Sequence, residues 1–226
     1  GNIVAGVDLI RRVESKSAHA LTIPLLEKSD GTKFGKSAAG AIWLDPEMTS
    51  PYAFFQFFLN SDDRDVEQLL KVFSFRSREE LEPLFESLLT NPGAREAHRA
   101  LAREVTTLIH GESTTVKVEA AAKALFGQGE IKELDLQTLQ SAMKELPQTA
   151  IAKGADIPSW VELIVATGVV DSKSAARRII KEGGAYLNNA KVMSEDFAPS
   201  SADLLHGKYL LLRKGKRDLA AVEVLG

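Results

Sequence analysis

Lys33-Phe34-Gly35-Lys36-Ser37 is a glycine-containing loop with two lysines three positions apart, and Asp30-Gly31-Thr32 comes directly before it. Gly35 lets the backbone approach a ligand closely, and each lysine carries a point charge on a flexible stem. Two such ammonium groups can converge on one polyanion. The loop therefore predicts phosphate binding, and an ordinary solvated turn is the alternative that these residues alone leave open.

The loop does not fit the Walker A pattern of nucleotide-binding P-loops. That pattern needs four residues between its first glycine and its Gly-Lys-Ser/Thr, whereas Gly31 and Gly35 enclose only Thr32-Lys33-Phe34. A P-loop also runs straight into a helix whose N-terminus holds the phosphates, but Gly40 and Pro46 interrupt the residues that follow here. We therefore exclude a P-loop.

The 226 residues, 44% hydrophobic and 26% charged, have the composition of soluble globular proteins and are enough for more than one domain. No apolar run is long enough to span a bilayer. Because cysteine is absent, disulfides and thiolate metal sites are excluded, and the cytoplasm is the expected compartment. His19, His98, His110 and His206 lack the spacing of metal ligands.

The residues before the lysine loop predict the end of an α/β domain. An apolar stripe predicts a helix over residues 3–14, with Arg11 and Arg12 favourably placed in its last turn. The apolar run Leu21-Thr22-Ile23-Pro24-Leu25-Leu26 predicts a strand, with Pro24 at an edge or a strand end.

The sequence from Pro46 onward predicts a bundle of short-looped helices. Seven of the ten phenylalanines lie between residues 54 and 85, and this spacing favours a packed core over a base-stacking platform. Start signals include Thr49 or Ser50 before Pro51, Ser61 before three aspartates, and the capping box Ser77-Arg78-Glu79-Glu80, while Pro83 predicts a kink or a later start. Further helices are expected over 95–110, 116–126 and 135–145.

The C-terminal part combines two short helices with two hairpins. Residues 147–157 are expected to form a linker, Ser159 to Thr167 a first helix, and Ser172 to cap a second helix. The net charge of −3 argues against a dedicated nucleic-acid protein, so an RNA-binding surface has to be a local patch. Candidate cations lie on the second helix and at the tip of the second hairpin: Lys173, Arg177, Arg178, Lys181, Arg213, Lys214, Lys216 and Arg217. A solvated basic face is the alternative.

The lysine loop resembles the second signature motif of class I aminoacyl-tRNA synthetases, in the form that bacterial tyrosyl-tRNA synthetases use. Ser174-Ala175-Ala176-Arg177-Arg178-Ile179-Ile180, with Gly183-Gly184-Ala185-Tyr186-Leu187-Asn188, resembles an S4-type RNA-binding domain. Flanking segments match the synthetase family in the same order: Gly1-Asn2-Ile3-Val4-Ala5-Gly6, Leu21-Thr22-Ile23-Pro24-Leu25, Asp30-Gly31-Thr32, Ala41-Ile42-Trp43-Leu44-Asp45, Ser50-Pro51-Tyr52 and Asp62-Asp63-Arg64-Asp65-Val66.

This resemblance implies a chain that starts inside the catalytic domain of a larger enzyme. The expected fold is the α/β tail of a Rossmann-like catalytic domain over residues 1–45, then an α-helical anticodon-binding bundle over 46–146. The linker over 147–157 is followed by a small α+β S4-like RNA-binding domain over 158–226. The first ATP motif and most of the tyrosine pocket would lie upstream, so the piece alone is expected to be inactive.

The resemblance also implies tyrosine–tRNA ligase chemistry with ATP and Mg²⁺, in which tyrosyl-adenylate forms and its tyrosyl group passes to tRNA(Tyr). Lys33 and Lys36 are assigned to the pyrophosphate, with Ser37 and the Gly35 amide as supporting donors. The backbone around Leu25 and Leu26 is expected to lie against the adenine ring. A homodimer formed through the catalytic domain, without membrane contact, is expected.

Two interpretations stay open at this point. In the family, an acidic residue at Asp62-Asp63 is associated with the anticodon, but helix capping explains these residues without RNA. A noncatalytic RNA-binding protein with an S4-like domain and an unused lysine loop is the alternative function. A tryptophan-specific relative is less favoured, because the S4-like tail goes with the tyrosine enzymes.

Overall fold

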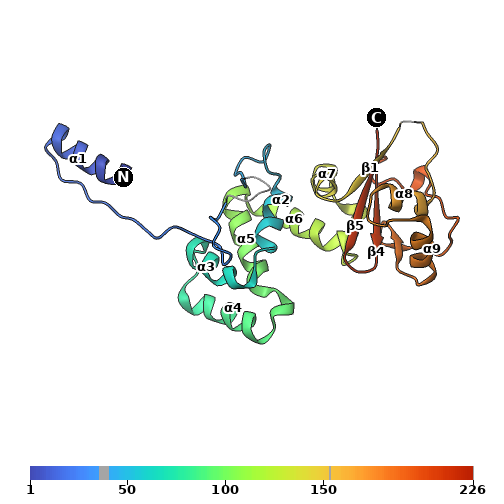
Figure 1. Ribbon diagram of the computed structural model, residues 1–226, viewed down its shortest axis with the longest axis horizontal. Helices are drawn as coiled ribbons and strands as arrows, with labels where there is room; N and C mark the ends of the chain where they lie inside the picture. Colours follow the sequence, from blue (N-terminus) through green and yellow to red (C-terminus); the bar gives the residue numbers. More distant parts are fainter. Residues whose placement is uncertain (36–40, 153, 226) are drawn as a thin grey trace. The chain divides into compact units, whose positions relative to one another are not determined.

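The computed structural model describes residues 1–35, 41–152 and 154–225 (Figure 1). The chain forms two compact units, Gly1–Ala41 and Ile42–Gly226. Within the described residues, no helix is both long enough and apolar enough to cross a bilayer. The domain boundaries inferred from the sequence at residues 45, 146 and 157 stay predictions.

The first unit contains the predicted N-terminal helix. Helix α1 spans Asn2–Glu14, and Arg11 and Arg12 of its last turn pair with Asp8 at 3.2 and 2.8 Å. None of its residues is buried, and Ile3, Val4 and Ile10 of its apolar stripe are exposed.

The predicted strand over residues 21–26 is wrong. No strand forms there, and the nearest pairing is an isolated bridge between Glu27 and Lys33. A strand requires a neighbour to complete its ladder of backbone hydrogen bonds. Within residues 21–26, only the Leu26 carbonyl gains such a bond among the described residues, from the Phe34 amide at 3.2 Å. Apolar content alone therefore misled the assignment.

The second unit begins with helices whose start signals act as the sequence predicts, with one exception. Ser50 caps α2 (Pro51–Leu59), and Ser77 with Glu80 forms the capping box of α4 (Arg78–Thr90), which continues through Pro83 without a later start. The exception is α3 (Asp63–Phe73), whose cap is Asp62 and not Ser61. An aspartate and a serine are equally good caps, and the residue in the extended conformation directly before the helix takes the role.

Helix α5 (Glu96–His110) is the centre of the bundle and packs against α2, α3, α4 and α6. Helix α6 (Glu112–Leu125) begins four residues earlier than expected, because the positive φ of Gly111 turns the chain within one residue. The predicted phenylalanine core is confirmed in part: Phe54, Phe55 and Phe58 are buried and the Phe58 ring contacts Phe73, but Phe75 is 83% exposed. The remaining elements are η1 (Pro92–Ala94), η2 (Ile131–Glu133) and α7 (Leu136–Lys144).

A five-stranded sheet of order β1-β5-β4-β2-β3 organises the C-terminal part (Figure 1). Contrary to expectation, the predicted linker contains a strand, since β1 (Gln148–Ile151) pairs in parallel with β5 (Asp218–Val224). All other pairs are antiparallel. No local pattern indicates β1, because its partner lies about seventy positions further along the chain. The other strands are β2 (Ala185–Leu187), β3 (Ala190–Lys191) and β4 (Tyr209–Lys214).

Two helices pack on one face of this sheet. Ser172 caps α9 (Lys173–Lys181) as predicted, and Ser159, expected as the first helical residue, is the cap of α8 (Trp160–Ala166). Trp160 is completely buried, and its indole nitrogen donates to the Tyr186 carbonyl at 3.0 Å. The core on this face also takes alternate residues of the two central strands, including Leu210, Leu212, Ala220 and Val222.

Asn188 closes the β2–β3 hairpin and ties it to the rest of the sheet. Asn188 and Asn189 have φ values of 46° and 68°, as a type I′ turn requires. The Asn188 side chain accepts from the Leu211 amide at 2.9 Å and donates to the Asp203 carbonyl at 2.6 Å. One residue thus connects the turn to β4 and to η3 (Ser201–Asp203).

We expect Asn188→Ala to reduce the free energy of unfolding by about 2–3 kcal/mol, because two side-chain hydrogen bonds are removed and alanine disfavours this left-handed conformation. Asn188→Gly tolerates the conformation, so its smaller loss isolates the hydrogen bonds. Urea unfolding followed by the fluorescence of buried Trp160 measures both variants. An alanine variant as stable as the unmodified chain would contradict the assignment.

Candidate functional site

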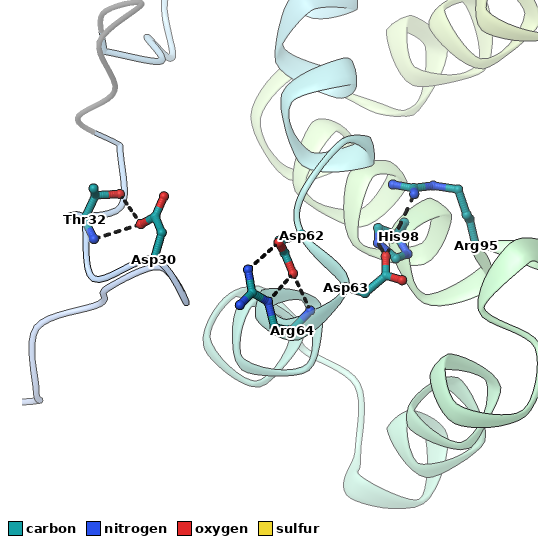
Figure 2. A network of polar contacts seen from close by, with 7 residues as sticks. All are labelled: Asp30, Thr32, Asp62, Asp63, Arg64, Arg95 and His98. Atoms are coloured by element: carbon teal, nitrogen blue, oxygen red, sulfur yellow. Dashed lines mark hydrogen bonds and ion pairs between the residues drawn. The ribbon is translucent and has the colours of Figure 1, made fainter.

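The lysine loop begins as a tight hairpin between Leu26 and Phe34. The Lys28 amide donates to the Thr32 carbonyl at 2.8 Å, and the Gly31 amide donates to the Lys28 carbonyl at 2.9 Å. Asp30 fixes the turn, since its Oδ1 accepts from both the backbone amide and the hydroxyl of Thr32 (Figure 2). The bend is therefore set by local hydrogen bonds around Gly31, whose φ is +80°.

The hairpin presents its charged end to solvent. Lys33 is exposed on the second arm, and Gly35 follows with a φ of +74° and with no atom near the place where a Cβ would stand. Leu25 is 60% exposed and Leu26 is half-buried, so these side chains are not core residues of the first unit. Lys36 and Ser37, which were assigned to the same phosphate site, lie outside the described residues.

The two aspartates at the start of α3, Asp62 and Asp63, make different contacts (Figure 2). Asp62 accepts from the Arg64 amide at 3.0 Å, and the Arg64 guanidinium binds both Asp62 oxygens at 2.9 and 2.8 Å. The Arg64 side chain, followed by the Arg64 amide, holds the pKa of Asp62 well below its usual range. Asp62 is thus a helix cap, as one of the two interpretations of the sequence held.

Asp63 instead faces helix α5. Its Oδ1 lies 3.0 Å from Nε2 of His98 and 3.9 Å from Nη1 of Arg95 (Figure 2). The His98 contact is close, although Nε2 of His98 has no hydrogen-bond partner of good geometry. The Asp63 side chain is still 55% exposed, so the carboxylate remains reachable by a ligand. Whether either aspartate binds RNA stays a prediction.

The His98 ring is completely buried, and this burial is the main cause of its lowered pKa. The positive charge of Arg95 lowers it further, while the carboxylate of Asp63 acts in the opposite direction. The pKa of His110 is also lowered by burial, and its ring meets Phe54 edge-on.

The basic stripe predicted on α9 is present, but most of its charges have carboxylate partners. Lys173 binds Glu162 at 2.8 Å and lowers the pKa of Glu162 to about 2. Glu195 pairs with both Arg177, at 3.5 Å, and Lys181, at 3.2 Å. All four α9 cations are exposed, so these pairs are screened by water and hold their side chains weakly.

The tip of the β4–β5 hairpin lies beside the end of α9, because the Gly215 amide donates to the Gly184 carbonyl at 2.7 Å. Arg213 faces the protein: its guanidinium lies 3.9 Å from the centre of the Tyr186 ring and donates to the Gly215 carbonyl. Lys214 pairs with Asp218 at 3.2 Å. Across residues 1–35, 41–152 and 154–225, no ion pair forms at Arg178, Lys216 or Arg217.

Three residues that the sequence analysis passed over matter to these sites. His98 holds Asp63, Glu195 neutralises two predicted RNA contacts, and the Lys191 ammonium lies where a side chain on Gly183 would be. Each acts on residues that are distant in sequence. In the sequence, a histidine among the apolar positions of a predicted helix was the one available indication, and it does not show which residue that histidine contacts.

No metal site is built into the part of the chain that the structure describes, since no three acidic or histidine side chains gather there.

Comparison with known proteins gives two family matches that follow one another along the chain. Residues 1–127 match the model "tRNA synthetases class I (W and Y)", and residues 138–222 match the model "Tyrosine--tRNA ligase SYY-like C-terminal domain". Similar curated proteins carry the name tyrosine–tRNA ligase. That of Streptomyces coelicolor is 57% identical over 100% of this chain and 53% of its own length, and that of Thermobifida fusca is 56% identical over 98% and 52%.

The chain therefore spans about half the length of the curated relatives it matches. Among solved structures, the solution structure of a tyrosyl-tRNA synthetase C-terminal domain is 27% identical, with a TM-score of 0.35, and covers 43% of this chain and 96% of that one.

We expect the free energy of unfolding to fall as the pH is lowered from 7.5 to 5. The folded pKa of His98 lies below its ordinary value of 6.5, so the unfolded chain takes up a proton first and is favoured as the pH drops through that window. His98→Gln, which does not titrate, should weaken this dependence, and urea unfolding at several pH values measures it. His110→Gln should weaken it independently, because the pKa of His110 is lowered too. A His98→Gln variant with an unchanged pH dependence would refute the assignment.

Proposed function

Because the chain belongs to the tyrosyl-tRNA synthetase family, we propose that the whole protein is a tyrosine–tRNA ligase that activates tyrosine with ATP and transfers the tyrosyl group to tRNA(Tyr). The observation that carries this proposal is the match along the full chain, at 57% identity, to a protein of that name. The described residues include the first part of the loop that would act on the ATP phosphates, up to Gly35, and a basic surface that would bind the tRNA.

In the first step, the tyrosine carboxylate attacks the α-phosphate of ATP and pyrophosphate leaves. Lys33 and Lys36 would stabilise the negative charge that grows on the leaving group, with the Gly35 amide and Ser37 as further donors. The hairpin supports this role for Lys33, which Asp30 and Gly31 hold exposed on one arm. Gly31 and Gly35, both with positive φ, would let the loop close over the phosphates during the reaction.

The other substrate contacts are also proposals. The backbone around Leu25 and Leu26 would lie against the adenine ring, and neither residue is buried. Mg²⁺ would enter with ATP, coordinated by its phosphates. We further propose a cytoplasmic homodimer that assembles through the catalytic domain.

The C-terminal part would bind tRNA as an S4-like domain. The order of its elements supports this, since the paired helices α8 and α9 precede two hairpins with basic residues at the tip of the second. Arg178, Lys216 and Arg217 would make the strongest phosphate contacts, because no carboxylate of the described chain competes for them. Lys173, Arg177, Lys181 and Lys214 would contribute by exchanging weak surface pairs for phosphates. Arg213 would orient the hairpin through Tyr186.

In the whole enzyme, we expect Lys36→Ala to slow tyrosyl-adenylate formation by roughly 2–4 kcal/mol, because a donor to the transition state is removed, and to leave tyrosine binding nearly unchanged. Single-turnover measurement of pyrophosphate release tests this. Lys33→Ala should act in the same direction. Lys28→Ala is the matched control, since the hairpin uses only the backbone of that residue. Chain 1–226 alone should show no release, and an unchanged rate in Lys36→Ala would remove Lys36 from the mechanism.

We expect the affinity of chain 1–226 for tRNA(Tyr) to fall steeply with salt, because bound cations release counterions from the RNA. Replacing Arg178, Lys216 and Arg217 together by glutamine should reduce the slope of log K against log salt by about one for each phosphate that is no longer neutralised. A fluorescence titration at several salt concentrations measures this slope. Lys144→Gln, at an exposed lysine on α7, is the control. An unchanged slope in the triple variant would place the RNA elsewhere.

A further inference from the structure

The loop between α2 and α3 is held from the bundle side by two residues at the start of α5. Arg95 donates from Nη2 to the carbonyl of Leu59, the last residue of α2. The other terminal nitrogen of Arg95 and Nε2 of His98 both face the same oxygen of Asp63 (Figure 2). Both ends of the loop are therefore fixed by α5, although they lie about thirty-five positions away in sequence.

Asp62 and Asp63 are held by different residues. Asp62 is held by its own helix, through the amide and the guanidinium of Arg64. Asp63 has its ion-pair contacts with α5 and still keeps 55% of its side chain exposed. The direction in which its exposed oxygen points thus depends on Arg95 and His98.

Neither Arg95 nor His98 is a residue that favours the stability of α5 itself. Arg95 takes a left-handed conformation, with φ 51°, at the N-cap position and makes no capping bond with its side chain. Such a backbone is unfavourable for a non-glycine residue and persists where surrounding contacts impose it. His98 is completely buried without a well-aligned hydrogen bond, which also costs stability. Both costs are offset by contacts to the α2–α3 loop.

We propose that Arg95 and His98 are positioning residues for tRNA recognition, which hold Asp63 so that its exposed oxygen accepts a hydrogen bond from a base of the bound tRNA. A carboxylate can accept from an exocyclic amino group, and a misdirected one cannot form that bond. His98 itself does not touch the RNA, because it is buried. This inference rests on the proposed function and assigns the RNA contact to Asp63, with Asp62 as the helix cap.

The whole enzyme tests this inference through two reactions. Tyrosine-dependent pyrophosphate exchange needs no tRNA, whereas aminoacylation reports the KM for tRNA(Tyr). We expect His98→Leu to raise that KM about tenfold, the effect of losing one hydrogen bond to a charged group, with pyrophosphate exchange unchanged. His98→Gln places an amide nitrogen near the position of Nε2 and should restore most of the affinity.

A double-mutant cycle separates positioning from general damage. If His98 acts through Asp63, His98→Leu should have almost no effect on the KM in an Asp63→Asn background. Full additivity of the two changes would overturn the inference. Arg95→Gln removes the second contact from a half-exposed position, and should raise the KM in the same way, so it decides the question if His98→Leu does not fold.

The outcomes distinguish this inference from the proposed function. An unmodified enzyme without tyrosine-dependent exchange or aminoacylation would refute the function. An active enzyme in which both His98→Leu and Arg95→Gln keep the original KM would refute the inference alone. Equal losses in exchange and in aminoacylation, together with a lower melting temperature, would show a purely structural role and would also overturn it.

Discussion

Charged side chains of α5 hold the connections between the helices that surround it. The apolar side of α5 buries Leu101 and Val105 against its neighbours, but apolar contact is not directional and does not by itself fix a loop. Glu104 supplies direction at the α3–α4 connection, where its carboxylate accepts from the Ser74 hydroxyl, the Phe75 amide and the Arg76 guanidinium at 2.9, 2.9 and 3.0 Å. One half-buried carboxylate thus accepts from three donors of the segment that follows α3.

Other side chains of α5 make similar contacts, including one with Asp63 at the start of α3. Arg103 pairs with Glu112 and Glu119 of α6, and His98 meets Asp63 at the start of α3. The α2–α3 and α3–α4 connections are therefore both tied to α5 by side-chain contacts. The lysine hairpin differs, because hydrogen bonds among neighbouring residues, including those from the Thr32 amide and hydroxyl to Asp30, shape its turn. A loop that must move during catalysis benefits from such local support, whereas a surface that must recognise a shape benefits from support by a packed helix.

Local signals were sufficient for most of the helices and insufficient for the sheet and the site. The caps at Ser50, Ser77 and Ser172 were predicted because a cap and the amide that it binds lie within three residues. The strand over residues 21–26 and the missed strand β1 failed for one reason, that strands exist only through partners that the local sequence does not name. The same distinction between local and distant partners applies to the residues of the candidate site. The sequence identified the exposed cations, but Glu195 and His98 contact residues distant in sequence, and only the folded chain brings these partners together.

Whether a cation is available to bind RNA depends more on its burial than on its ion pairs. An exposed cation can change its partner, whereas a buried one stabilises the fold. Glu195 lies between Arg177 and Lys181, yet exposed pairs of this kind contribute only about 0–1 kcal/mol and are screened by salt. A phosphate, with its greater charge, can replace such a partner at little cost. Arg213 cannot be released in this way, because its guanidinium is packed on Tyr186 and its Nε is buried. A chain with a net charge of −3 can therefore offer a polyanion a positive surface, since its acidic residues near that surface hold the cations loosely enough to exchange.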